Sequence, residues 1–197
     1  MNSLQVGLTG GIGSGKSTVA NFFKNILNIP VYFADDRAKF LVNHNDFIIS
    51  SILNNFGNNA YLNGVYNKPF ISSIVFNDKD KLSILNDIIH PIVQQDYYDW
   101  LDKYKNAPYT IKEAAIMIEA NVYQELDLLI LVSANTTVKI NRVMNRDSLL
   151  EEDVLNRMSK QMSDFEKREF VNKEILNNDN NKLIPQILKI HKFLINR

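Results

Sequence analysis

The sequence contains no cysteine among its 197 residues. This absence excludes disulfides, thiolate metal ligands and cysteine nucleophiles, and it is typical of a reducing compartment. The chain also lacks an excess of either charge, since 22 basic and 22 acidic residues give a formal net charge of zero. Proteins that follow nucleic-acid phosphates usually carry a clear basic excess, so we expect no nucleic-acid partner.

Long apolar runs are also missing. No stretch approaches the roughly 20 residues that a membrane span needs, and the start of the chain has no signal-peptide pattern. We therefore expect a cytoplasmic protein that does not enter a membrane, and we expect a monomer. The chain length fits one domain with room for an insert, and a 45% share of hydrophobic residues is enough for a packed core.

Glycine is scarce overall but concentrated near the start, where residues 7–18 read Gly-Leu-Thr-Gly-Gly-Ile-Gly-Ser-Gly-Lys-Ser-Thr. Gly10, Gly15, Lys16 and Ser17 match G-x-x-x-x-G-K-[ST], the phosphate-binding loop. Glycines bring backbone N–H groups close to phosphate oxygens, and the following helix directs its positive end at them. The residues expected to bind the nucleotide are Gly11, Ile12, Gly13, Ser14, Gly15, Lys16, Ser17 and Thr18.

Two of these residues have expected roles of their own. Lys16 can reach the β- and γ-phosphates of ATP, and the Ser17 hydroxyl can coordinate Mg²⁺. A chance match of a glycine-rich turn would lack the flanking strand and helix, whereas residues 4–9 are an apolar run and residues 17–27 have helical periodicity. The pattern predicts nucleoside triphosphate binding and does not say what happens to the phosphate.

A second short strand, 31–33, completes a parallel strand–helix–strand unit, whose ligands bind at the carboxyl ends of the strands. Asp35 and Asp36 follow this strand. A carboxylate here can orient Mg²⁺ or accept a proton from an attacking hydroxyl, or it can simply cap the next helix. The two adjacent aspartates allow both roles, and the spacing does not say which residue has which.

Residues 46–56, 69–76, 80–90 and 93–104 have helical periodicity, with Pro91 separating the last two segments and residues 57–67 forming a turn-rich excursion. No strand pattern interrupts this region. We therefore expect a mostly helical insert where an acceptor substrate binds, with its aromatic residues more often packed in a core than stacked on a ligand.

Residues 109–118 and 126–132 are predicted strands, and neither ends in the aspartate of a Walker B segment, which disfavours motor ATPases. Helices are expected over 136–145 and, opened by a Ser148/Glu151 capping box, up to Met158. These helices carry a polar group that suits either a phosphate-covering lid or a solvated helix face, formed by Arg142, Arg146, Arg157 and Gln161. A last strand, 173–176, a polar turn, 177–181, and a helix, 183–194, follow.

Several features together resemble the dephospho-coenzyme A kinase family. These are the opening phosphate loop, Asp35 in the second-strand loop, His90-Pro91, Glu119 after an apolar segment, Arg142 to Asp147 as Arg-x-x-x-Arg-Asp, Arg157-Met158-x-x-Gln161, and Asn177 after the final strand. The match follows the chain order over nearly its whole length. It differs at Phe33, which replaces the first aspartate of the family's frequent Asp-Ala-Asp, and at Asp36, which is additional.

The resemblance implies a three-layer α/β/α P-loop kinase with a parallel sheet of about five strands. It implies a core of residues 1–36, 108–140 and 170–197, a helical acceptor-binding insert of residues 37–107 and a small helical lid of residues 141–169. The implied reaction is ATP- and Mg²⁺-dependent phosphorylation of the ribose 3′-hydroxyl of dephospho-CoA, the last step of coenzyme A synthesis.

The resemblance also assigns site residues. Asp35 would be the general base and a metal-binding residue, Lys16, Arg142 and Arg157 would serve the phosphates, and Ser17 would bind Mg²⁺. Asn177 would contact the nucleotide. Two alternatives stay open: another small-molecule kinase of this class, acting on a nucleoside or a nucleoside monophosphate, and a regulatory nucleotide-binding switch. Asn172-Lys173 lacks the following aspartate of a guanine-reading motif, so GTP specificity has no support.

Overall fold

The computed structural model describes residues 3–76 and 78–197, and the chain forms two compact units. The first unit combines the residues up to Phe33 with those from Tyr104 to the end of the chain. The second unit is the continuous segment Ala34–Lys103. No helix in the described ranges is long and apolar enough to cross a bilayer.

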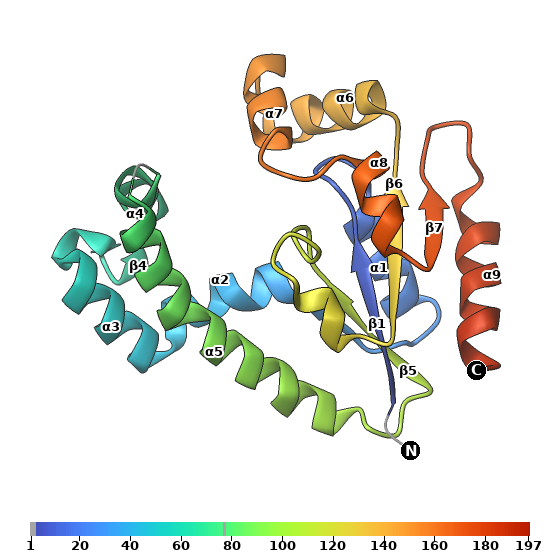
Figure 1. Ribbon diagram of the computed structural model, residues 1–197, viewed down its shortest axis with the longest axis horizontal. Coiled ribbons are helices and arrows are strands. Elements are labelled where there is room, and N and C mark those ends of the chain that lie inside the picture. The colour runs from blue at the N-terminus through green and yellow to red at the C-terminus, as the bar shows by residue number, and fades with distance from the viewer. Residues whose placement is uncertain (1–2, 77) are drawn as a thin grey trace. The chain divides into compact units, whose positions relative to one another are not determined.

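The first unit is built on a five-stranded sheet in the order β2-β5-β1-β6-β7, and every neighbouring pair is parallel (Figure 1). This confirms the predicted parallel sheet of five strands. The strands are β1 (Leu4–Thr9), β2 (Val31–Phe33), β5 (Tyr109–Glu113), β6 (Leu128–Ser133) and β7 (Lys173–Leu176).

Helices and loops cover both faces of this sheet, which confirms the three-layer class. Val6 and Leu8 of β1 belong to the core cluster that includes α1 (Lys16–Asn25) and α9 (Leu183–Ile195). Gly7, between them, points the other way, since a Cβ there would lie 2.7 Å from the sulfur of Met117. On that second face, α8 (Asp164–Lys167) contacts β6.

The predicted strand over 109–118 is too long, because β5 ends at Glu113. Residues 117 and 118 are buried, yet they lie in turns rather than in the sheet. Their apolar character reflects packing onto the sheet face, which the sequence does not distinguish from a buried strand. The 3₁₀ helix η2 (Val122–Glu125) then leads to β6.

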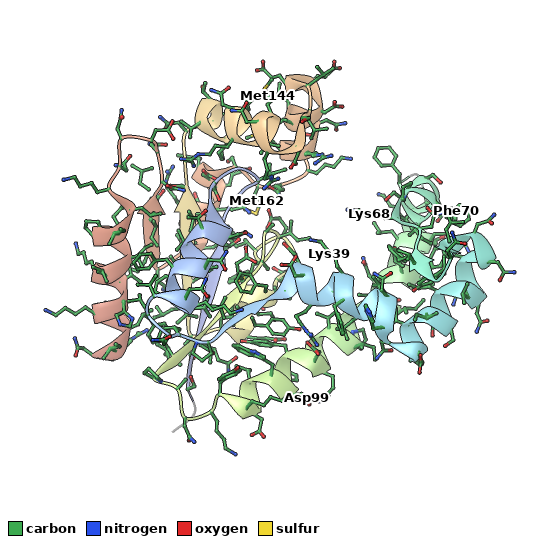
Figure 2. All side chains as sticks on the ribbon, turned by 180° about the vertical axis from the view of Figure 1, so that it is seen from behind. Lys39, Lys68, Phe70, Asp99, Met144 and Met162 are labelled. Carbon is green, nitrogen blue, oxygen red and sulfur yellow. The ribbon has the colours of Figure 1, made fainter. Side chains whose placement is uncertain are left out.

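Helices α6 (Thr136–Asp147) and α7 (Glu151–Met158) pack through Ile140, Val143 and Val154, with Met144 beside them (Figure 2). The predicted Ser148/Glu151 capping box is wrong. Ser148 ends α6 in a left-handed conformation with a φ of 53°, and the residue that caps α7 is Leu150. The capping box forms instead at Ser163 and Glu166, at the start of α8, before the 3₁₀ helix η3 (Arg168–Phe170).

The second unit contains α2 (Ala34–His44), α3 (Asp46–Phe56), α4 (Lys68–Val75) and α5 (Lys79–Lys103), with the 3₁₀ helix η1 (Asn58–Ala60). Buried apolar side chains from all four helices form its core, including Leu41, Ile48, Ile52, Ile71 and Leu85. The prediction that no strand interrupts this region is wrong. An antiparallel hairpin pairs β3 (Tyr61–Leu62) with β4 (Val65–Tyr66).

The hairpin has a signal in the sequence that the helical periodicity around it obscured. Asn63 and Gly64 join the two strands with φ angles of 50° and 78°. Asn-Gly is the preferred pair for a two-residue hairpin loop, because both positions need a positive φ. The helix α5 differs from its prediction too, since it continues through Pro91. Leu85 and Ile88 are buried before the proline and Tyr97 is buried after it, so packing on both sides stabilises one continuous helix.

Candidate active site

The phosphate loop connects β1 to α1 and has the backbone that its glycines permit. Gly13 and Gly15 have φ angles of 79° and 85°, in the left-handed region that other residues rarely adopt. A Cβ on Gly13 would lie 2.4 Å from the backbone oxygen of Lys139, so α6 packs directly against the loop. Helix α1 has no acidic residue in its first turn, and its free N–H groups and positive end are therefore available to an anion.

Both predicted phosphate- and metal-contacting side chains of this loop meet one carboxylate. Lys16 is buried and forms an ion pair with Glu113 at the end of β5. The Ser17 hydroxyl donates to Oε1 of the same Glu113 at 3.2 Å. Glu113 itself is only 3% exposed. This residue was not predicted, because the apolar pattern continues to position 118 and the expected strand-end residue was an aspartate, whereas the strand ends here in glutamate.

These groups fit the ligands that the motif implies. A hydroxyl and a carboxylate are hard oxygen donors of the kind that Mg²⁺ prefers, and Mg²⁺ usually keeps several waters and binds only one or two carboxylates. The part of the chain that the structure describes has no cluster of three or more histidine, cysteine, aspartate or glutamate side chains that could hold a metal ion.

Arg142 and Asn177 also lie at the phosphate loop. The Asn177 amide donates from Nδ2 to the backbone oxygen of Ser14 at 2.8 Å. Nη2 of Arg142 donates to Asp179 at 2.9 Å, whereas its Nη1 is buried without a hydrogen-bond partner among the described residues. That Nη1 would be 3.8 Å from a Cβ on Gly15, so an unused cationic donor faces the loop. A phosphate oxygen of a nucleotide is a suitable acceptor for it.

The other members of the polar group separate. Arg146 and Arg157 both contact Asp147, at 2.7 Å and 3.4 Å, and hydrogen bonding from Arg146 lowers the pKa of that carboxyl below its ordinary value. The side chain of Arg157 is 51% exposed. Gln161, in contrast, reaches the phosphate loop, where its Oε1 accepts a hydrogen bond from the backbone N–H of Ile12 at 3.0 Å.

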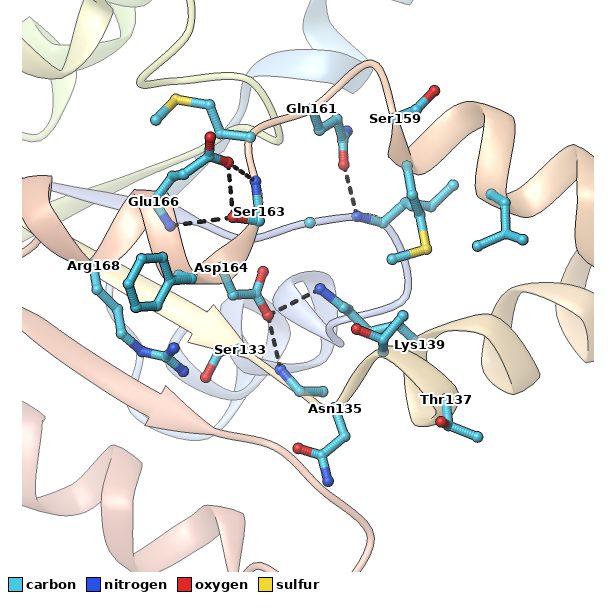
Figure 3. A pocket seen from close by; sticks show the side chains of 18 of the residues that line it. Ser133, Asn135, Thr137, Lys139, Ser159, Gln161, Ser163, Asp164, Glu166 and Arg168 are labelled. Atoms are coloured by element: carbon cyan, nitrogen blue, oxygen red, sulfur yellow. Dashed lines mark hydrogen bonds and ion pairs between the residues drawn. The ribbon is translucent and has the colours of Figure 1, made fainter.

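A pocket of about 830 Å³ lies beside this contact, lined by Gly11 and Ile12, by the start of α6 and by the segment that ends in α8 (Figure 3). A buried ion pair crosses its wall, with 2.9 Å between Lys139 Nζ and Asp164 Oδ2. The same Oδ2 accepts a hydrogen bond from the backbone N–H of Ala134. Asp164 thereby connects β6, α6 and α8, and the pair fixes α6 where it supports Gly13.

The remaining predicted residues belong to other elements. Asp35 and Asp36 occupy the first turn of α2 and are exposed, and Asp36 pairs with Lys39 at 3.0 Å. Glu119 contacts protein groups: its Oε1 accepts a hydrogen bond from the backbone N–H of Met162 at 3.0 Å and lies 3.1 Å from Nζ of the buried Lys167. His90 lies within α5.

Comparison with known proteins identifies the family. The dephospho-CoA kinase family model matches residues 4–183. A dephospho-CoA kinase from Bacteroides fragilis is 32% identical over 192 residues, which cover 98% of this chain and 93% of the relative. The crystal structure of TT1252 from Thermus thermophilus superposes with a TM-score of 0.89 at 27% identity, with 98% of each chain covered.

A dephospho-CoA kinase from Campylobacter jejuni has the same fold, with a TM-score of 0.70 at 22% identity over 98% of this chain and 97% of that chain. These similarities confirm the predicted P-loop kinase class. The family match covers the phosphate loop, the strand that carries Glu113 and the segment that holds Arg142 and Asn177. The chain therefore belongs to the dephospho-CoA kinase family.

Proposed function

We propose that this protein transfers the γ-phosphoryl group of ATP to the ribose 3′-hydroxyl of dephospho-CoA, giving coenzyme A and ADP. The observation that carries the proposal is the phosphate loop, with Lys16 and Ser17 at the start of α1, in a chain whose family match spans residues 4–183. Phosphoryl transfer needs mostly positioning and charge neutralisation, which such a loop provides.

On the donor side, the loop N–H groups between Gly11 and Thr18 bind the phosphates, and Lys16 neutralises the charge at the γ-phosphoryl. The unused Nη1 of Arg142 supplies a second cationic donor beside Gly15. Asn177, hydrogen-bonded to Ser14, fixes the loop from the nucleotide-binding side. The Ser17 hydroxyl would hold Mg²⁺, which would supply further neutralisation of the phosphate charge.

The segment 141–169 serves as a lid. Gln161 already contacts the backbone of Ile12. Arg157 is exposed, and within the part of the chain that the structure describes its ion-pair partner is Asp147, at 3.4 Å. An exposed arginine pair costs little to break, so Arg157 is free to approach the transferring phosphoryl group. Exclusion of water by such a segment prevents wasteful hydrolysis of ATP.

On the acceptor side, Asp35 orients and deprotonates the ribose hydroxyl. Its carboxylate is exposed, and among the described residues no side chain pairs with it as Lys39 pairs with Asp36. The helical segment 37–107 binds the rest of dephospho-CoA. Its exposed apolar side chains, Phe47, Leu62 and Val65 among them, offer contacts for an uncharged pantetheine arm.

The test is a phosphotransfer assay with purified protein, MgATP and a panel of acceptors. We expect ADP release that depends on dephospho-CoA and a product with the mass of coenzyme A. Transfer to AMP or a nucleoside, but not to dephospho-CoA, would assign a different small-molecule kinase activity. Nucleotide binding with no transfer to any acceptor would instead indicate a regulatory switch.

Asp35→Asn tests the acceptor side, with Asp36→Asn as the matched control. Loss of a general base typically costs about 10²–10⁴-fold in rate, and we expect a loss in this range for Asp35→Asn with unchanged ATP affinity. Asp36→Asn removes only an exposed pair with Lys39, so its turnover should match that of the parent chain. The reverse order of effects would assign the base to Asp36.

A further inference from the structure

Gln161 brings an uncharged side chain to the phosphate loop from the segment between α7 and α8. Its Oε1 accepts a hydrogen bond from the backbone N–H of Ile12 at 3.0 Å, as Figure 3 shows. A Cβ on Gly11 would lie 3.7 Å from the same Oε1. The amide therefore lies at the end of the loop that follows β1, whereas α1 begins at the other end of the loop.

The hydrogen bond with Ile12 fixes which way the amide points. A backbone N–H bonds only to an acceptor, so it selects the oxygen of the Gln161 amide and leaves Nε2 directed elsewhere. Nε2 carries two N–H donors, and no described residue accepts a hydrogen bond from it. Unlike the buried Nη1 of Arg142, this nitrogen is open to solvent. Gln161 thus presents unused, uncharged donors beside the loop.

Contacts on both sides of Gln161 hold its backbone in place. Its own N–H donates to the backbone oxygen of Met158, at the end of α7, at 3.0 Å. The N–H of the next residue, Met162, donates to Glu119, which pairs with the fully buried Lys167 of α8. Helix α8 in turn contacts β6. A fixed backbone reduces the conformational freedom that the side chain loses when it binds a ligand.

The place of Gln161 along the loop indicates which phosphate its donors would meet. Lys16 and Ser17 open α1, and the free N–H groups at the start of that helix would bind the inner phosphates of a nucleotide. A triphosphate would then extend away from the helix, toward Gly11 and Ile12. A diphosphate is one phosphate shorter and would end before this point. The amide donors therefore lie where ATP and ADP differ.

We propose that Gln161 recognises the terminal phosphate of ATP, with Oε1 held by Ile12 and Nε2 donating to a γ-phosphoryl oxygen. This inference rests on the proposed function only in its use of ATP as the phosphoryl donor. An amide suits this position, because it adds hydrogen bonds to the phosphate without adding a third positive charge to those of Lys16 and Arg142. The contact stabilises bound ATP and is absent from bound ADP, so it does not slow the release of ADP.

Two substitutions separate the donor from the acceptor of this amide. Gln161→Met keeps the length of the side chain and removes both. Since a hydrogen bond to a charged group contributes about 10–100-fold to an affinity, the affinity for ATP should fall by about that factor, and the affinity for ADP should remain that of the parent chain. Gln161→Glu keeps an acceptor for Ile12 and replaces the donors by a negative charge. Its affinity for ATP should fall at least as much, with a much smaller loss for ADP.

Isothermal titration calorimetry with Mg²⁺ and without any acceptor measures both affinities, using ADP and the β,γ-imido analogue of ATP, which is not hydrolysed. Gln124→Met is the matched control, because this glutamine of η2 is exposed and its side chain has no hydrogen bond with a described residue. It should change neither affinity. In ¹H–¹⁵N spectra of the parent chain, the side-chain amide signal that is missing from Gln161→Met should shift with the ATP analogue and not with ADP.

Equal losses of affinity for the two nucleotides in Gln161→Met would mean that the side chain only fixes the loop, and would overturn the proposal. An unchanged affinity for the ATP analogue in either folded variant would overturn it too, as would an amide signal that responds equally to ADP. If thermal melting shows that Gln161→Met does not fold, Gln161→Glu decides the question, because it keeps the bond to Ile12. Failure of the parent chain to phosphorylate dephospho-CoA would overturn the proposed function instead, because these binding measurements contain no acceptor.

Discussion

The packing of α6 against the phosphate loop predicts a large difference between two glycine-to-alanine substitutions in that loop. Gly13 has a φ of 79°, and a Cβ there would lie 2.4 Å from the backbone oxygen of Lys139. The left-handed conformation costs a residue with a side chain about 1–2 kcal/mol. Overpacking against a rigid neighbour costs about 1–3 kcal/mol more. Gly13→Ala should therefore lose about 2–5 kcal/mol of unfolding free energy by these two principles together.

Gly11→Ala is the matched control, because it adds the same methyl group to the same loop. The φ of Gly11 is not in the left-handed region, and a Cβ there would have its nearest neighbour at 3.5 Å, an ordinary contact. Without strain or clash, alanine restricts the unfolded chain and is neutral or stabilises by up to about 1 kcal/mol. Gly13→Ala should thus destabilise the chain, whereas Gly11→Ala should leave its stability unchanged or raise it slightly.

Calorimetric melting without nucleotide measures the difference, since a bound ligand would add its own stabilisation. For a chain of this length about 1 kcal/mol corresponds to about 2–4 °C. Gly13→Ala should then melt about 4–20 °C below the parent chain, and Gly11→Ala at the parent temperature or slightly above it. Equal melting temperatures for the two variants, or a melting temperature of Gly11→Ala below that of Gly13→Ala, would refute the contact between Gly13 and α6.

Two further predictions concern ion pairs of the first unit. Lys139→Met and Asp164→Asn each leave a buried charge unpaired, so each should lower the unfolding free energy by about 3–5 kcal/mol. The double variant should lose less than the sum of the two single losses, because no unpaired charge remains. Thermal unfolding of the parent chain, the two single variants and the double variant measures this coupling. Hydrogen bonding from Arg168 lowers the pKa of Glu174 in the folded chain. The pair therefore stabilises the folded state at a pH above the ordinary carboxyl pKa, and this stabilisation is lost as the pH falls through the lowered pKa of the folded state. Urea unfolding at pH 7 and in acid should show a smaller acid-induced loss for Glu174→Gln than for the parent chain.

Periodicity and motif spacing were sufficient to predict the parallel sheet, most helices and the phosphate loop, because these depend on local pattern. The errors arose where burial has several explanations. Met117 is apolar because it packs on the sheet face, and it was read as part of a strand. Pro91 was read as a helix end, although the helix is continuous. Both outcomes depend on tertiary packing, which a local pattern does not contain.

The candidate site was predictable only in part for the same reason. Lys16 and Ser17 are adjacent in the chain and belong to a known spacing. Glu113 is 97 positions from Lys16 and follows another lysine, Lys112, so no local spacing links it to the phosphate loop. Its role becomes visible only when the register of β5 beside β1 is known. The Asn63-Gly64 turn, in contrast, carries a local signal that a hairpin search finds.

The arrangement of the strands and the chemistry of the site impose the same constraint. Glu113 reaches Lys16 from β5 on one side of β1, while Lys139 supports Gly13 from the helix that follows β6 on the other side. Side chains alternate between the faces of a strand, so a slip of β5 by one residue would turn Glu113 away and bring Lys112 in its place. A buried second lysine beside Lys16 would have no counter-charge. The register that keeps the sheet packed is therefore also the one that gives Lys16 of the phosphate loop its counter-charge.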